Sequence, residues 1–299
     1  MDLTISIVSF NTKDKLEACL NSIFNYTGTL DIEVFVIDNA SKDNSVEMVK
    51  SKFPKVTVIT NKENKFLTKA HNMAFDKAKG KYLLILNSDT LINDKTIDEC
   101  VKFLENNKES GAITCKTYNS DGSFQIIYSK DYTYKLALMN YTFLGKLFPK
   151  TKKILNDEFT YNNDIGNQLK EVEVVGDANL WAKMEIIRQI DGYDDRFKLY
   201  YTENDICIKI RKTGHKIFYI PQGNVTHYVR QSVEKEGIRS VSQIYYEDTI
   251  KYYLKYNGFL QAVILAILIK ITNLLLILKY SRNSNIFYAF LNHPKNDKK

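Results

Sequence analysis

Several residue types and motifs that would point to other protein classes are scarce or absent. The 299 residues contain only four cysteines, four prolines and one tryptophan. The cysteines lack the paired spacing of a metal site, and Cys19 and Cys100 lie in helix-like segments. We therefore expect packed thiols in a reducing cytoplasm. Residues 1–4 lead directly into a strand-like run, so no signal peptide is expected.

Two nucleotide-binding motifs are missing as well. No Gly-x-Gly-x-x-Gly follows the first apolar run, which counts against NAD or FAD, and no Gly-x-x-x-x-Gly-Lys-Ser/Thr occurs, which counts against a P-loop NTPase.

The net charge is +7, but no nucleic-acid motif accompanies it. Much of the excess flanks an apolar stretch near the C-terminus and continues into residues 295–299. This distribution favours a membrane surface over nucleic acid as the partner.

The first ninety residues alternate apolar runs with helix-like segments. Four short runs are predicted strands: residues 5–10, 32–37, 56–60 and 82–86, the last of them expected to be buried on both faces. In the first helical segment Leu16, Leu20 and Ile23 recur at helical spacing, and Thr12 is placed to cap it. The alternation predicts an α/β fold, with a Rossmann-like, mostly parallel sheet flanked by helices.

Polar residues follow three of these strands. The three clusters are Ser9-Phe10-Asn11, Asp38-Asn39 and Asn87-Ser88-Asp89. Parallel strands end at one edge of a sheet, where α/β proteins bind ligands, so we expect the clusters to converge. Asp89 is a candidate ligand for a divalent cation that also binds substrate phosphates. Asn, Ser and Asp are also common in turns, so the last triplet alone does not decide between the two interpretations.

The second half of the chain is less regular. After a turn signal at residues 119–123 we expect an irregular insertion at about 124–170, either shaping acceptor choice or without a role. The remaining predictions are a strand at 172–175, a helix through Trp181, Met184 and Ile187, an acidic cluster at 203–205, and short strands at 217–220 and 225–228.

Four motifs in order resemble the inverting family 2 glycosyltransferases of the GT-A fold, most of all the bacterial rhamnosyltransferase-like branch. The resemblance covers about residues 4–232. The motifs are Ser6-Ile7-Val8-Ser9-Phe10-Asn11; Val36-Ile37-Asp38-Asn39-Ala40-Ser41 with Asp43-Asn44-Ser45; Asn87-Ser88-Asp89; and Gly192-Tyr193-Asp194 followed by Tyr200-Tyr201-Thr202-Glu203-Asn204-Asp205 and His227.

The resemblance implies roles for individual residues. Asp38 would contact the base or ribose of a sugar nucleotide, and Asp89 and His227 would hold Mn²⁺ or Mg²⁺ against its diphosphate. Glu203 would be the catalytic carboxylate, with Asp205 as the alternative if the register slips. The other residues implied in nucleotide-sugar binding are Ser9, Phe10, Asn11, Asn39, His71, Asn87, Ser88 and Asp177.

The sequence departs from the family pattern at three places. Phe66-Leu67-Thr68 stands where the family usually has Gly-Phe-Ala, so the backbone there must differ. Thr202-Glu203-Asn204-Asp205 replaces the common Glu-Asp-x-Asp. Asp177 stands in a usually apolar pair near the donor sugar, which suggests that it reads sugar hydroxyls.

The chemistry of inverting transfer explains these residue types. A general base must take the proton of the acceptor hydroxyl, and a divalent metal stabilises the departing diphosphate. An ordinary Glu pKa of about 4.3 leaves Glu203 ionised at neutral pH, as a base requires. A retaining hydrolase would need two facing carboxylates, and residues 203 and 205 do not face each other on a helix.

The C-terminal stretch from Phe259 to Leu278 is strongly apolar but is interrupted by Lys270, Thr272 and Asn273. A membrane-spanning helix, helices lying in the membrane interface, and a helix buried in a homo-oligomer are the alternatives. Tyrosines before the stretch, and Lys279, Tyr280 and Arg282 after it, favour the interface.

These observations predict a GT-A domain at residues 1–235 and a helical, membrane-associating tail at 236–299. The predicted function is metal-dependent transfer of a sugar from a nucleotide donor to a cell-surface polysaccharide or lipid-linked glycan. The first candidate donor is dTDP-rhamnose. The predicted location is the cytoplasmic face of the cell membrane. The alternatives are a UDP-hexose-dependent transferase and an inactive glycan-binding scaffold of the same fold, which would have no reason to keep Asp89, Glu203 and His227 together.

Overall fold

The computed structural model describes residues 1–26, 28–93, 95–161, 166–228 and 238–280, which form two compact units. The first unit is Met1–Asp131 with Glu158–Tyr252, and the second is Tyr132–Asp157 with Tyr253–Lys299. The boundary that we predict at residue 235 falls among residues 229–237, outside the described residues. The division at that position stays a prediction.

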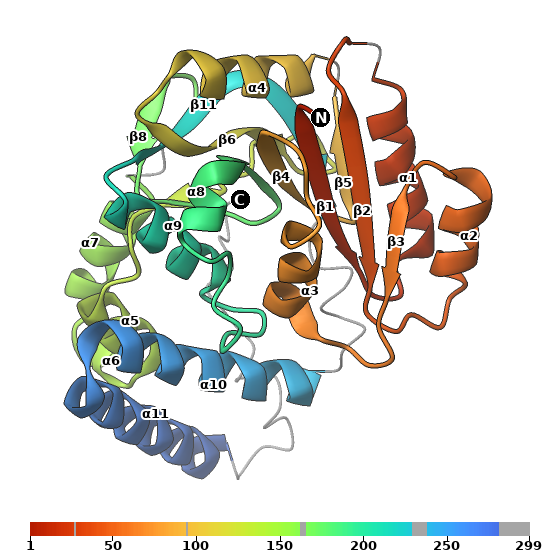
Figure 1. Ribbon diagram of the computed structural model, residues 1–299. Helices are drawn as coiled ribbons and strands as arrows, with labels where there is room; N and C mark the ends of the chain where they lie inside the picture. Colours follow the sequence, from red (N-terminus) through yellow and green to blue (C-terminus); the bar gives the residue numbers. More distant parts are fainter. Residues whose placement is uncertain (27, 94, 162–165, 229–237, 281–299) are drawn as a thin grey trace. The chain divides into compact units, whose positions relative to one another are not determined.

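A mixed sheet of nine strands forms the centre of the first unit (Figure 1). In sheet order the strands are β3 (Thr57–Thr60), β2 (Ile32–Asp38), β1 (Leu3–Ser9), β4 (Tyr82–Asn87), β10 (Asn179–Lys183), β6 (Ser110–Tyr118), β11 (Lys216–His227) and β5 (Thr90–Ile92), with β8 (Lys170–Val172) paired to β11. Strands β1 to β4 are mutually parallel, whereas β10 runs antiparallel to both of its neighbours. A short pair, β7 (Tyr128–Ser129) and β9 (Val174–Val175), lies apart.

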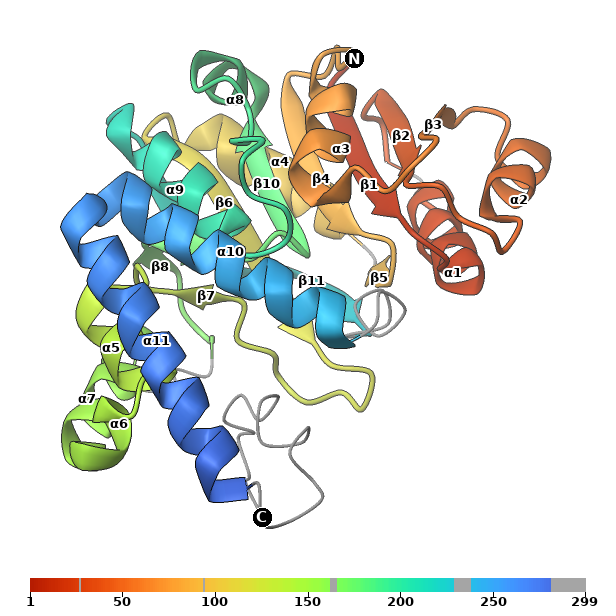
Figure 2. The same ribbon diagram turned by 90° about the horizontal axis from the view of Figure 1, so that it is seen from below.

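Helices cover both faces of this sheet (Figures 1 and 2). The buried cluster on one face includes residues of α1 (Lys13–Phe24), α2 (Ser45–Lys52) and α4 (Thr96–Asn106). The other face packs against α3 (Phe66–Phe75), α8 (Met184–Gln189) and α9 (Thr202–Lys212). Strand β4 contributes Leu84 and Leu86 to the first face and Leu83 and Ile85 to the second. The α/β sandwich predicted from strands buried on both faces is thereby confirmed.

The strand register aligns the predicted polar clusters at one edge. Ser9 is paired with Asp38, and Val8 is paired with Asn87. Strand β10 begins at this edge, because it runs antiparallel to β4 and pairs Asn179 with Leu86. The residues just before β10 therefore join the carboxyl ends of β1, β2 and β4.

Two secondary-structure predictions in the second half of the chain are wrong. Trp181 lies on strand β10 and not on a helix, because the run from Asn179 is buried between β4 and β6, and only at Met184 does a helix begin. The two short strands expected around Pro221 are one strand, β11. Its pairing with β6 shifts between Ile220 and Asn224, and a proline is accommodated at such an irregularity.

Part of the segment expected to be irregular is helical. It contains α5 (Tyr134–Tyr141), α6 (Leu144–Leu147) and α7 (Pro149–Phe159). Helix α7 buries none of its residues. Pro149 stands at its first helical position, where proline is favoured.

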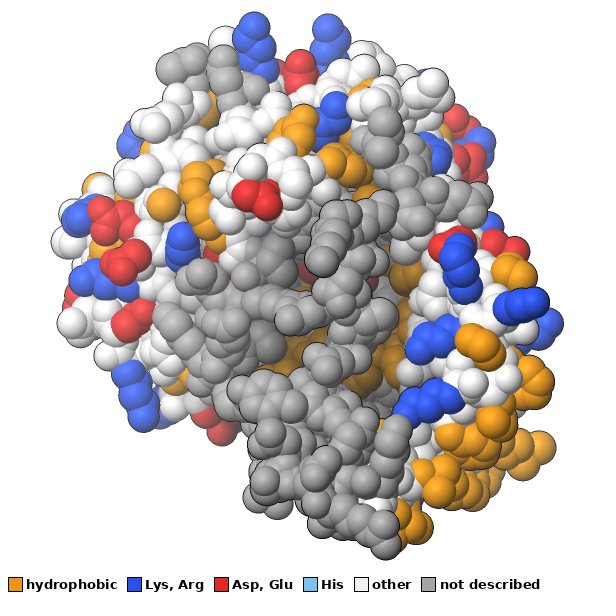
Figure 3. All heavy atoms as spheres, turned by 180° about the vertical axis from the view of Figure 1, so that it is seen from behind, with side chains coloured by type: hydrophobic (Ala, Val, Ile, Leu, Met, Phe, Trp, Pro, Cys, Tyr) orange, Lys and Arg blue, Asp and Glu red, His pale blue; other side chains and the backbone are white. Residues whose placement is uncertain are grey.

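The second unit also contains α11 (Phe259–Tyr280), while α10 (Ile238–Asn257) divides between the two units at Tyr252. Within this unit the Thr272 hydroxyl accepts a hydrogen bond from the Phe143 backbone N–H (2.9 Å). Ala262 and Leu265 are buried. Figure 3 shows hydrophobic side chains gathered over α11.

Candidate active site

Asp89 and His227 lie next to each other, although the chain separates them widely. His227 Nε2 is 3.4 Å from Asp89 Oδ1 and 3.3 Å from the Asn87 amide nitrogen. Both side chains are nearly buried. The pairing of β5 with β11 explains the meeting, because it sets His227 opposite Thr90, the residue that follows Asp89. The Tyr228 N–H also donates to the Asp89 carbonyl (2.9 Å).

Gln125 orients the His227 ring. Its Oε1 lies 3.2 Å from His227 Nδ1, a contact that requires the proton on Nδ1 and directs the Nε2 lone pair toward Asp89. Metal-ligating histidines are commonly held in this way. No local sequence pattern marks Gln125 as part of the site.

A divalent cation suits this donor set. An imidazole nitrogen and a carboxylate oxygen face each other at 3.4 Å. Among the described residues no group of three or more His, Cys, Asp and Glu is placed to share a metal. Two protein ligands are sufficient for Mn²⁺ or Mg²⁺ when substrate phosphates supply others.

Three hydroxyls connect β1 to the loop after β4. Thr12 Oγ1 is 3.0 Å from Ser9 Oγ and 2.9 Å from Ser88 Oγ, and all three residues are buried. The Thr12 side chain consequently makes no capping bond at α1, contrary to our expectation. The chain of hydroxyls fixes the loop that carries Asp89.

Asp38 keeps one carboxylate oxygen available for a ligand. Its Oδ1 accepts the Ser41 N–H (2.9 Å), whereas its buried Oδ2 has no hydrogen-bond partner among the residues that the structure describes. The side chain of Asn39 is engaged by the following loop, since it donates to the Phe66 carbonyl and accepts from Asn61 Nδ2. Asn39 therefore holds that loop next to Asp38.

Asn11 has the left-handed backbone conformation, with φ of 54°. Its Oδ1 accepts the Lys42 N–H (2.7 Å), and its own N–H donates to Ser41 Oγ. These bonds join the loop after β1 to the loop after β2. Phe10 beside it is partly exposed at the same edge.

His71 lies in the interior of the unit. It is fully buried, its Nδ1 is 2.8 Å from Ser6 Oγ, and its ring packs near Phe75 and Tyr193. Burial lowers the pKa of His71 to about 3, so the ring is neutral. The structure does not bring His71 into contact with Asp38 or Asp89.

Glu203 and Asp205 both lie in the first turn of α9 but differ in accessibility. Asp205 is fully buried, whereas Glu203 is partly exposed. The Thr202 hydroxyl lies 2.6 Å from Asp177 Oδ2 and 3.1 Å from Glu203 Oε2. Accessibility favours Glu203 over Asp205 as the group that meets a substrate.

Burial raises the pKa values of both linked carboxyls, Asp177 and Glu203. Burial, followed by the negative charge of Glu203, raises the pKa of Asp177 to about 7. Burial also raises the pKa of Glu203 above its ordinary value. Such shifts are frequent at sites of proton transfer.

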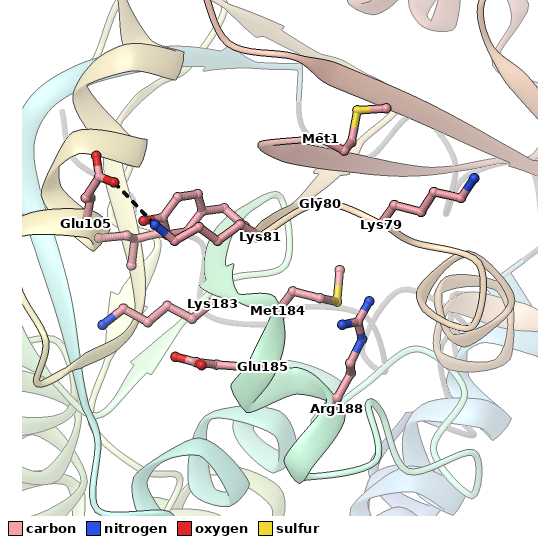
Figure 4. A pocket seen from close by; sticks show the side chains of 11 residues that line it. Met1, Lys79, Gly80, Lys81, Glu105, Lys183, Met184, Glu185 and Arg188 are labelled. Atoms are coloured by element: carbon pink, nitrogen blue, oxygen red, sulfur yellow. Dashed lines mark hydrogen bonds and ion pairs between the residues drawn. The ribbon is translucent and has the colours of Figure 1, made fainter.

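A pocket of about 410 Å³ lies away from these residues, where β4 begins and not where it ends (Figure 4). Lys81, Lys183 and Arg188 contribute to its lining, but each already has a protein partner: Glu105, two backbone carbonyls and the Ala78 carbonyl. Glu105 and Glu185 add negative charge. The chemistry described above therefore does not extend into this pocket.

Residues 4–164 match the family model described as Glycosyl transferase family 2. The chain belongs to this family. The matched region includes the strand ends that carry Ser9, Asp38 and Asp89. Its central sheet, covered by helices on both faces, is a GT-A-like fold that solved structures share.

Two curated relatives illustrate the sequence similarity of this family 2 chain. It is 29% identical over 126 residues to a chondroitin synthase of Pasteurella multocida, covering 40% of this chain and 13% of the relative. It is 25% identical over 183 residues to the poly(ribitol-phosphate) beta-N-acetylglucosaminyltransferase TarS of Staphylococcus aureus, covering 58% of this chain and 31% of TarS. The similarity thus spans a third or less of either relative.

Solved structures share the fold. The mannosyltransferase PcManGT from Pyrobaculum calidifontis, in complex with GDP-Man and Mn²⁺, has a TM-score of 0.58 at 17% identity, covering 85% of this chain and 63% of that one. TarS residues 1–349, in complex with UDP-GlcNAc, has a TM-score of 0.56 at 14% identity, covering 85% of this chain and 67% of that one.

Proposed function

We propose that this family 2 protein is an inverting, metal-dependent glycosyltransferase that uses a nucleotide-sugar donor. The observation that carries the proposal is the pair of Asp89 and His227, 3.4 Å apart at the sheet edge to which Asp38 also belongs. A metal-ligand pair beside a nucleotide-binding edge suits a diphosphate leaving group. An inactive scaffold would not need this pair.

The described residues divide the work of binding the donor. Asp38 Oδ2, buried and unbonded within the described part of the chain, is suited to accept a hydrogen bond from the base or ribose. Asp89 and His227 would hold Mn²⁺ or Mg²⁺, which when bound neutralises charge on the diphosphate. Ser9 and Ser88 keep the intervening loop in place through Thr12. Asp177, two residues before β10, is the residue that we expect nearest the sugar hydroxyls.

Glu203 is the proposed general base. It takes the proton of the acceptor hydroxyl while that oxygen attacks the anomeric carbon, and the bond to the diphosphate breaks with its electron pair on the phosphate oxygen. The raised pKa of Glu203 makes it a stronger base than an ordinary glutamate.

For the donor, dTDP-rhamnose is the first candidate, because the sequence motifs resemble the rhamnosyltransferase-like branch. A UDP-linked sugar is the second, supported by the UDP-GlcNAc complex of TarS. The acceptor that we propose is a cell-surface polysaccharide or a lipid-linked glycan. The relatives named above act on glycan or poly(ribitol-phosphate) chains according to their names.

The test is a panel of nucleotide sugars with purified protein and Mn²⁺, scored by release of each nucleoside diphosphate in the presence of candidate acceptors. Glu203→Gln keeps the size of the side chain but removes the base, so transfer should fall by on the order of 10²–10⁴ while nucleotide binding persists. Asp205→Asn, two residues further along α9, is the matched control. Loss of transfer only in Asp205→Asn would assign the base to Asp205.

We also propose that the protein associates with the cytoplasmic face of the membrane through α11. Phe259–Leu278 is long and apolar enough to cross a membrane, with a mean hydropathy of 2.3, and only 17% of its most apolar window is buried. Thr272, which seemed to interrupt the apolar stretch, is bonded within the second unit. The outward face is apolar, which supports helix insertion into the interface. Arg282 and residues 295–299, predicted to face lipid headgroups, lie outside the described residues.

A further inference from the structure

Two carboxylates at the site share one hydroxyl. The Thr202 Oγ1 atom lies between Asp177 Oδ2 and Glu203 Oε2, at 2.6 Å and 3.1 Å. A hydroxyl has one proton to donate and can accept through its lone pairs. The shorter contact assigns that proton to Asp177, so a lone pair of Thr202 faces Glu203.

Asp177 is held in place from a second side. The buried Tyr193 hydroxyl donates to Asp177 Oδ1 (2.5 Å), and the Tyr193 ring packs against Phe75 and His71. Each oxygen of Asp177 therefore receives a hydrogen bond from a well-packed residue. A carboxylate anchored in this way has a fixed position relative to Glu203.

We propose that Asp177 is a positioning residue for glycosyl transfer: it fixes the Thr202 hydroxyl, and through that hydroxyl and its own charge it sets the orientation and basicity of Glu203. The inference rests on the proposed function and deepens it. It gives Asp177 a task besides contact with the donor sugar.

The arrangement favours the protonated form of Glu203. When Glu203 is ionised, two negative charges face one hydroxyl that can donate to only one of them. When Glu203 has taken the acceptor proton, it donates to Thr202 Oγ1 while Thr202 donates to Asp177. The Thr202 proton stays on Thr202 throughout, and the only proton transferred is that of the acceptor. Removal of the repulsion adds driving force to proton abstraction.

Other titratable or charged groups lie near Asp177 and Glu203. Cys207, one turn further along α9, is buried, and the charges of Asp177 and Glu203 help to raise the pKa of its thiol. Glu203 likewise helps to raise the pKa of Tyr252. The nearby cation is Arg211, which is paired with Asp131 (2.5 Å). Asp205 lies on the same turn of α9 and adds negative charge.

The first arm of the test compares Asp177→Asn with the parent enzyme. Asn keeps the shape of the side chain but removes the charge. We expect kcat at pH 7.5 to fall on the order of tenfold. Because Glu203 loses a like-charged neighbour, the acidic limb of the kcat profile should move to lower pH. An unchanged kcat and an unmoved limb would overturn the inference.

The second arm changes the hydroxyl alone. Thr202→Val is nearly isosteric but cannot donate or accept, and a similar loss of kcat is expected. Thr202→Ser keeps the hydroxyl and should recover most of that loss. If the serine and valine variants are equally impaired, the hydroxyl is not the link.

The third arm needs no donor and separates this inference from the proposed function. The pKa of Asp177 rises from 3.8 to about 7 on folding, so its contribution to stability is present below pH 4 and is lost as pH rises through about 7. The Tm of Asp177→Asn minus that of the parent should therefore increase from pH 5 to pH 8. A difference independent of pH would overturn the pairing, whereas the absence of transfer with every donor would contradict only the proposed function.

Discussion

At the scale of single residues, the candidate site depends on side chains that touch across long sequence separations. Asn87 and His227 are 140 positions apart, yet their side-chain nitrogens are 3.3 Å from each other. Gln125 orients the ring from a third segment. Because these side chains contact one another, the effects of substituting them should not be additive.

The first residue-scale prediction concerns the metal. Asp89→Asn should raise the Mn²⁺ concentration for half-maximal transfer strongly, since it removes an anionic ligand. Gln125→Ala, which leaves both proposed ligands intact but frees the His227 ring, should raise it by about 10- to 100-fold. Rates of nucleoside diphosphate release over a Mn²⁺ series provide the measurement. An unaltered Mn²⁺ requirement in both variants would exclude this pair as the metal site.

At the scale of elements, α11 has an outward stripe of apolar side chains at steps of three and four. Its members are Leu260, Ile264, Ile267, Ile271, Leu274 and Leu278, each at least 40% exposed. Lys270 is exposed beside the stripe. Free energy is gained when a helix of this pattern lies in a membrane interface, because its apolar stripe is removed from water.

The element-scale prediction is that the stripe carries membrane binding. Ile267→Glu combined with Ile271→Glu should reduce co-sedimentation with anionic-lipid liposomes at least tenfold, because two charges would enter the acyl boundary. Leu169→Glu is the control, since Leu169 is 54% exposed but lies in the first unit. Equal binding by the double variant and the control would contradict the assignment, and a parent protein that does not bind would dismiss it altogether.

At the scale of the whole molecule, ligand binding and folding are coupled. A nucleoside diphosphate bound with Mn²⁺ at 100 times its Kd should add about 2.7 kcal/mol to the free energy of unfolding. Thermal unfolding with UDP, dTDP or GDP, each with and without Mn²⁺, measures this effect. We expect a rise in Tm that needs both components. No rise with any diphosphate would favour the inactive scaffold.

Much of the first unit was predictable from the chain. Short apolar runs buried on both faces determine β1, β2 and β4, and the polar residues after them determine where the ligand edge lies. Those runs need no tertiary information, because a parallel strand between two helical layers must be apolar on both sides. The motifs that resemble family 2 glycosyltransferases agree with the family match.

Tertiary structure decided the rest, because it depends on pairing partners that are remote in sequence. Trp181 has helical spacing with its neighbours but lies on β10, since β4 and β6 offer it backbone partners on both sides. Thr12 bonds to Ser9 and Ser88 instead of capping α1. The link of Thr202 to Asp177 appears only when the start of α9 meets the start of β10. Composition and periodicity thus determined the sheet and its functional edge, while hydrogen bonding across the fold decided which side chains complete the site.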